Sequence, residues 1–344
     1  MKTTLLATVV IVLVGCTQTP TTPMSVCAAL ESECEQEDSM LVLGGDATSR
    51  EILQTVISAA DLFEKRFGWA PTPTAVVPGG NISIAQDKLL DAAGYTVQLP
   101  WLTAGDKAKL LEGSIRSQVE AQTAGLPDSV REAAVAKALA AIDNKSSPDS
   151  TDSLHDGALA HELGHLWYIA MTRRGGAAHE TGHAYGGFAP DWLDETFAVL
   201  METDEMRERR RAAFRDMNAE DIVPLREFLT MTHPAAEAAK QLHANLPTKK
   251  EGSASQVIVL TKEEAKDFLA QSGGGRASQF YSQVQVFADY MLARAGEATV
   301  YVTITDWLVA GGTFESWLAS EGATHGLPTT LEQLERDWMA WLAS

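Results

Sequence analysis

The pentapeptide "HELGH", from His161 to His165, constrains the fold of this chain more than any other feature. Two histidines four positions apart lie on one face of an α-helix, where both imidazoles can bind the same metal ion. Glu162 lies about 100° around that helix, so its carboxylate can reach water beside the metal and act as a general base. The pattern therefore predicts a buried helix that carries a metal centre.

The residues around this pentapeptide predict a helix over about residues 153–175, with apolar side chains recurring at the helical period. Ser153, followed three positions later by Asp156, predicts a capping box at the start of the helix. Arg173 and Gly175 suit its end, because a cation favours the negative end of the helix dipole and glycine favours a helix stop.

The same pattern recurs as "HETGH", from His179 to His183, inside "GGAAHETGHAYGG". Five of these thirteen residues are glycine, and each glycine inside a helix costs about 1 kcal/mol relative to alanine. We therefore predict a loop here. Its residues His179, His183 and Tyr185 are candidates to lie over the metal centre, with His183 the preferred donor to a substrate.

A metal centre of this kind needs a third protein ligand. Six residues after His165 the chain has Met171, so a third histidine at that spacing is absent. The segment "DWLDETFAVLMETDEMRERRR" instead predicts a helix over about 191–217, whose inner face presents Glu195. We take Glu195 as the third ligand, and the alternative is that His179 or His183 fills this place.

Two further acids lie near this glutamate in the sequence. Asp194 and Glu202 either orient a ligand histidine or are solvated charges on the helix surface. The basic run from Arg207 to Arg211 is interpreted as a solvated helix face. The four remaining histidines are interpreted as ordinary surface residues: His155, His233, His243 and His325.

Together, "HELGH" and the later segment "WLDETFA" resemble the gluzincin metallopeptidases of the peptidase-MA-like group, over roughly residues 40–344. The resemblance implies one Zn²⁺ per chain, held by His161, His165 and Glu195. It also implies that Glu162 is the catalytic base and that the substrate is a peptide or protein. Tyr281, in the helix expected over about 278–295, resembles the tyrosine with which this family stabilises an oxyanion. The alternative for this residue is a buried structural role.

The chain departs from the family pattern in two respects. Twenty-nine residues separate His165 from Glu195, which is longer than in the best-known gluzincins. The "G-x-M-E-N" segment that binds a substrate amine in the aminopeptidase branch is absent from the sequence, so aminopeptidase activity is unsupported.

The expected fold class is α+β and zincin-like, with a small mixed sheet and helices near the N-terminus and the zinc helix in a cleft. We expect an N-terminal α+β part over residues 40–190 and a helical C-terminal part over 191–344. The alternation of apolar residues predicts strands at about 40–45, 73–80, 95–102 and 255–260. The helical period predicts further helices at about 48–68, 129–143, 224–230 and 330–343.

Residues 1–15 predict an export signal, and the ending "LVGC" resembles a bacterial lipobox in which Cys16 becomes lipidated. An ordinary signal peptide is the alternative. Residues 16–39 are expected to tether the protein to the bacterial envelope, and to the outer membrane where the organism has one. The lipid would be its only membrane contact. In that oxidising compartment Cys27 and Cys34 are expected to form a disulfide, or otherwise to remain thiols.

The net charge of -19 excludes nucleic acid as an expected partner, because the chain offers no basic face for phosphates. The sequence therefore favours a zinc-dependent peptidase that hydrolyses peptide bonds and is anchored to the envelope. The alternative is a catalytically inactive lipoprotein of the same fold that serves as a binding or scaffold module. Substrate specificity, endo- against exopeptidase action and oligomeric state do not follow from the sequence.

Overall fold

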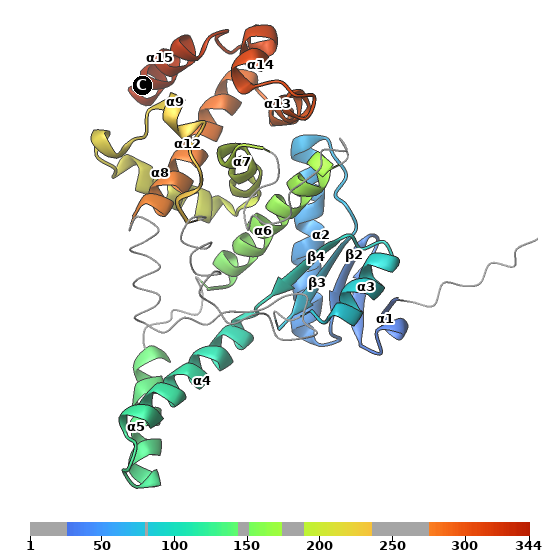
Figure 1. Ribbon diagram of the computed structural model, residues 1–344, viewed down its shortest axis with the longest axis vertical. Coiled ribbons are helices and arrows are strands. Elements are labelled where there is room, and N and C mark those ends of the chain that lie inside the picture. The colour runs from blue at the N-terminus through green and yellow to red at the C-terminus, as the bar shows by residue number, and fades with distance from the viewer. Residues whose placement is uncertain (1–25, 80–81, 144–150, 174–188, 236–274) are drawn as a thin grey trace, which may run out of the picture.

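A small sheet occupies the N-terminal part of the protein, and helices form the rest of the part that the structure describes (Figure 1). The structure is a computed structural model that describes residues 26–79, 82–143, 151–173, 189–235 and 275–344. The expected mixed sheet near the N-terminus and the mainly helical C-terminal half are confirmed. Several predictions lie outside the described residues: the export signal with Cys16, the second pentapeptide with His179, His183 and Tyr185, the strand at 255–260, and His243.

The sheet has four strands in the order β1-β2-β3-β4. The first pair is antiparallel and the other two pairs are parallel, so the sheet is mixed. The strands are β1 (Cys34–Glu37), β2 (Met40–Leu43), β3 (Thr74–Pro78) and β4 (Val97–Trp101).

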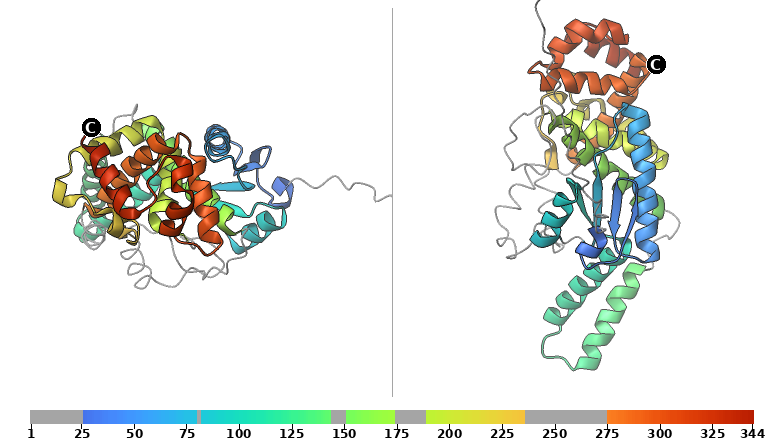
Figure 2. Two further views of the ribbon diagram at one scale, coloured as in Figure 1. Left: turned by 90° about the horizontal axis from the view of Figure 1, so that it is seen from above. Right: turned by 90° about the vertical axis from the view of Figure 1, so that its right-hand side faces the viewer.

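Both faces of the sheet are covered, because alternate side chains of the central strands enter different cores. Val42 and Val76 pack with α2 (Ala47–Phe67) in the main core. Leu41 and Val77 face the other way and pack with Leu90 of α3 (Ile84–Ala92). The sheet thus lies between two helices, and α2 connects it to the helical part (Figure 2).

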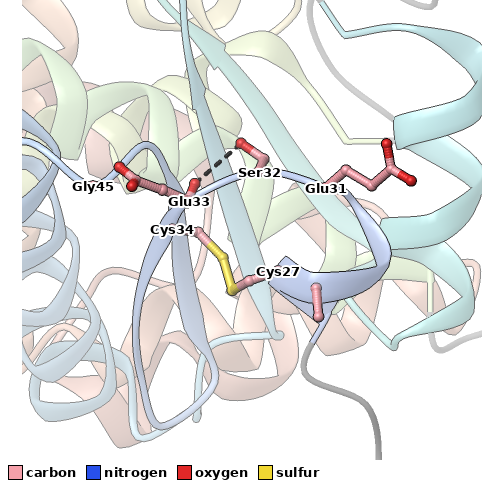
Figure 3. Close-up of a pocket in the computed structure, with 7 residues that line it drawn as sticks. Cys27, Glu31, Ser32, Glu33, Cys34 and Gly45 are labelled. Carbon is pink, nitrogen blue, oxygen red and sulfur yellow. Dashed lines mark hydrogen bonds between the residues drawn. A yellow bond between two sulfur atoms is a disulfide. The ribbon is translucent and has the colours of Figure 1, made fainter.

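The folded part of the chain already includes residues that were expected in the tether. The short helix α1 (Val26–Ala29) is joined to β1 by the disulfide between Cys27 and Cys34, as Figure 3 shows. The disulfide is therefore confirmed.

The predicted tether of 16–39 overlaps folded residues, because α1 and β1 lie within this range and β1 pairs with β2 in the sheet. The hollow beside the disulfide is lined by no residue of the predicted metal centre.

A helical hairpin projects from the sheet side of the molecule (Figure 1). It consists of α4 (Ala104–Gln122) and α5 (Asp128–Asp143), of which the sequence predicted only α5. The start of α4 has a capping box, in which Thr103 and Asp106 each accept a hydrogen bond from the other's backbone N–H.

The helix of the first pentapeptide, α6 (Thr151–Arg173), crosses between α2 and α7 (Asp191–Met201) (Figure 1). It begins at Thr151, so the predicted capping box at Ser153 is wrong: Ser153 already lies inside the helix. Among the described residues of the C-terminal half, the other helices are α8 (Asp204–Arg215), α9 (Leu225–Phe228), α12 (Arg276–Ala295), α13 (Thr299–Val309), α14 (Phe314–Glu321) and α15 (Leu331–Leu342). Short 3₁₀ turns lie at Ala219–Asp221 and Gly322–His325.

The single helix predicted over 191–217 is wrong, because the chain forms α7 and α8 with a break between them. Glu202 ends α7 in an extended conformation, and the side chain of Thr203 accepts a hydrogen bond from Met206 N–H to cap α8. Every residue of α7 from Trp192 to Met201 is buried. This helix therefore lies in the centre of the protein.

Within the described residues, none of the helices combines the length and the apolar content that crossing a lipid bilayer requires.

Candidate metal centre

Three side chains from α6 and α7 converge at one buried point. His161 and His165 are 7% and 8% exposed, and their Nε2 atoms lie 3.2 Å apart. Glu195 is 1% exposed, with Oε1 3.4 Å from His161 Nε2 and Oε2 3.5 Å from His165 Nε2. The three predicted metal ligands, which come from two helices, are therefore brought together.

The spacing of these donors fits a bound metal ion. An ion with tetrahedral bonds of 2.0–2.1 Å holds its donors about 3.3 Å apart, and the three separations in the protein are 3.2, 3.4 and 3.5 Å. Both oxygens of Glu195 are buried without a hydrogen-bond partner among the described residues. Since a buried carboxylate without hydrogen bonds is costly, a cation bound at this point would stabilise it. The three residues are thus positioned to hold a metal ion.

Each histidine has a buried carboxylate behind it. His165 Nδ1–H donates to Asp194 Oδ1 at 2.8 Å, and His161 Nδ1 lies 2.8 Å from Glu202 Oε1. Both acids are buried, so they are partners of the histidines and not solvated charges. A proton held on Nδ1 leaves the Nε2 lone pair directed at the metal position.

The acids also change how the centre binds protons. Burial lowers the pKa of His165, but the charges of Asp194 and Glu195 outweigh it and raise this pKa to about 10. Burial raises the pKa of Glu195, and the two histidines oppose that change. Protons and a metal ion therefore compete for the same atoms.

This competition predicts that metal affinity increases with pH. Below about pH 10 both ring nitrogens of His165 are protonated in the metal-free protein, and the ion must displace the proton on Nε2. Each proton displaced makes the apparent affinity rise about tenfold per pH unit. Competition between the protein and a chelator for Zn²⁺ at pH 6.5, 7.5 and 8.5 measures this slope. An affinity independent of pH, once corrected for the chelator, would contradict the assignment of His165.

A glycine allows α6 and α7 to approach this closely. A Cβ atom on Gly164 would lie 2.9 Å from Ala198 Cα and 3.0 Å from the carbonyl oxygen of Phe197. Both contacts are with backbone, which cannot move aside without shifting the helix. The glycine within "HELGH" thus sets the distance between the two ligand-bearing helices.

The substitution Gly164→Ala is expected to lower the free energy of unfolding by about 1–3 kcal/mol, because it overpacks this contact. It should also weaken metal binding, since it moves Glu195 away from the histidines. The matched control is Gly113→Ala in α4, where an added Cβ meets nothing within 4 Å and alanine should stabilise by about 1 kcal/mol. Urea unfolding with metal titration checks both. Wild-type stability in Gly164→Ala would argue against close packing here.

The structure also places the two predicted catalytic residues that lie in its described part. Glu162 is exposed on α6, and its charge contributes to the raised pKa of His165. Tyr281 of α12 is half-buried, with its ring centre 6.0 Å from that of His161. Both candidates therefore lie beside the predicted metal ligands.

His233 was expected to be a surface residue, and this prediction is wrong. It is 1% exposed, and its ring centre lies 4.9 Å from that of Tyr281. Its backbone N–H donates to Asp191 at the start of α7, at 2.6 Å. Burial, with the charges of His165, His161 and Arg210, lowers the pKa of His233 to about 4. No sequence pattern links "THP" to the centre, because a tertiary contact alone brings it there.

The basic run of α8 is only partly a solvated face. Arg209 is exposed and pairs with Glu205. Arg210, by contrast, has a side chain 19% exposed and pairs with the buried Glu202. The prediction of a solvated run is therefore wrong for Arg210 and for Arg207, whose side chain is 12% exposed. No sequence pattern separates Arg210 from its exposed neighbours, because only the contact with Glu202 buries it.

Comparison with protein-family models, with curated proteins and with solved structures finds no match to this chain. The interpretation of the centre therefore depends on its own geometry. Two imidazoles and a carboxylate at these separations can bind a metal ion, and an exposed carboxylate beside them can accept a proton.

Proposed function

We propose that the protein is a zinc-dependent peptidase of the gluzincin type, with a zincin-like fold. The observation that carries this proposal is the meeting of His161, His165 and Glu195 at tetrahedral separations, with Glu162 exposed beside them. Two nitrogen donors and one carboxylate are the set that catalytic zinc sites of the His₂Glu kind use. One Zn²⁺ per chain is expected.

When bound, Zn²⁺ would supply Lewis acidity that polarises a carbonyl and makes water more acidic. Glu162 would accept the proton of the attacking water and later deliver it to the leaving amine. Asp194 and Glu202 would keep the two ligand imidazoles in their orientation.

Two groups are candidates to stabilise the negative charge that develops on the carbonyl oxygen. Tyr281 would donate through its hydroxyl group. His233 accepts a hydrogen bond from Ala235 N–H at Nδ1, at 3.1 Å, so its neutral ring carries the proton on Nε2. Its pKa of about 4 keeps the ring neutral at pH 7. His183, outside the described residues, remains a further candidate.

The expected substrate is a peptide or protein, met at the bacterial envelope. The lipobox-like segment ending at Cys16 supports anchoring there through a lipid. The acidic net charge of -19 supports a protein that does not bind nucleic acid.

The test combines metal analysis with a peptide-library digest of the purified chain. One zinc per chain and cleavage that a chelator stops and added Zn²⁺ restores would support the proposal. Zinc bound without any cleavage would favour the inactive binding or scaffold module. Protein that stays metal-free after expression with ample zinc would contradict the zinc peptidase.

A further inference from the structure

Arg210 of α8 contacts two groups that lie near His161, Glu202 and Tyr281. Its Nε–H donates to Glu202 Oε2 at 2.6 Å, and Nη2–H donates to Glu202 Oε1. That same Oε1 is the atom 2.8 Å from His161 Nδ1. On its other side, the Cζ atom of Arg210 lies 4.6 Å from the ring centre of Tyr281.

The pairing with Glu202 has a defined geometry. A guanidinium group and a carboxylate that share two parallel hydrogen bonds fix each other's plane as well as their distance. The side chain of Glu202 is fully buried. Glu202 is the C-cap residue of α7, and its backbone is extended and not helical. The plane of the carboxylate behind His161 is therefore set by Arg210.

The contact with Tyr281 has a different physical basis. A guanidinium over the face of an aromatic ring is attracted by the ring's electron density. The ring of Tyr281 thus contacts Arg210, and the ring centre of His233 lies 4.9 Å from that of Tyr281. This contact keeps the tyrosine beside His161, at 6.0 Å between ring centres.

We propose that Arg210 is a positioning residue for the metal centre, which orients His161 through Glu202 and holds Tyr281 on the same side. The inference rests on the proposed metal site, and its Tyr281 part rests on the proposed peptidase activity. The metal-site part is tested by Zn²⁺ affinity, which can be measured even if the protein hydrolyses no peptide.

The primary test is the Zn²⁺ affinity of Arg210→Met, measured by chelator competition on the full chain. Loss of a group that orients a metal ligand lowers affinity by roughly 10–100-fold, and because Arg210 acts through Glu202 we expect about tenfold. The matched control is Arg211→Met. Arg211 is the next residue of α8 and pairs with Asp289 through two hydrogen bonds of 2.7 and 3.0 Å. This control should keep wild-type affinity.

A double-variant cycle separates positioning from general destabilisation. If Arg210 acts through Glu202, Arg210→Met combined with Glu202→Gln should bind Zn²⁺ no more weakly than Glu202→Gln alone. Losses that multiply would overturn the proposed route, and so would equal affinities in Arg210→Met and Arg211→Met.

Arg210→Lys covers the case in which Arg210→Met does not fold, as judged by circular dichroism. Lysine restores the positive charge but cannot form the bidentate hydrogen bonds of a guanidinium or stack a planar group on Tyr281. We therefore expect Arg210→Lys to recover only part of the Zn²⁺ affinity. Full wild-type affinity would overturn the proposal. With peptide substrate and saturating Zn²⁺, Arg210→Lys should lower kcat more than it changes KM, because Tyr281 would act in the transition state.

Discussion

Replacing Glu162 with glutamine is expected to lower kcat for peptide hydrolysis by about 10²–10⁴-fold. Glutamine has the same shape but cannot accept the proton of the attacking water. Glu162 is exposed and is not among the three metal ligands, so the fold and the metal content should be unchanged. The measurement is kcat at saturating Zn²⁺, with zinc counted by mass spectrometry on the same sample.

The matched control for this variant is Glu64→Gln, which changes an exposed glutamate of α2 in the same way. It should retain wild-type kcat. A Glu162→Gln protein that binds one zinc and cleaves peptides at the wild-type rate would show that another group is the base.

The second large effect concerns the third ligand. Glu195→Ala is expected to weaken Zn²⁺ binding by more than about 100-fold, because a ligand contributes more than the orienting groups behind it. The zinc content of purified protein should fall from one per chain to near zero. The comparison variant is His183→Ala, from the second pentapeptide, which should keep its zinc.

These two variants separate the alternatives that the sequence left open. Zinc retained in Glu195→Ala but lost in His183→Ala would move the third ligand to the glycine-rich segment. Zinc lost in both would mean that the segment also binds the ion. Circular dichroism of both proteins excludes unfolding as the cause of a loss.

Much of the centre was predictable because it depends on local sequence. A helix of 3.6 residues per turn places His161 and His165 on one face in any fold. The start of α7 at Asp191 and the end of α12 at Ala295 also agree with the prediction from the sequence. The Cys27–Cys34 disulfide joins residues seven positions apart, so it too was within reach of a local argument.

The roles of the surrounding residues were not predictable in this way. His233 and Arg210 sit in segments with no pattern that separates them from surface residues, and burial decides their chemistry. The break at Glu202 was missed although its signal is local. Thr203, followed by Asp204 and Glu205 in the first turn, caps a new helix.

The sequence by itself determined the helix of the first pentapeptide, the pair of imidazoles on its face and the glutamate that could complete a metal site. These follow from helical geometry and from the chemistry of the side chains. Only the tertiary structure decided that the two helices meet at Gly164, which brings Glu195 within 3.5 Å of both histidines. It also decided that Asp194 and Glu202 lie behind them. The reason is physical: contacts between helices depend on packing across long separations in the chain, which periodicity does not encode.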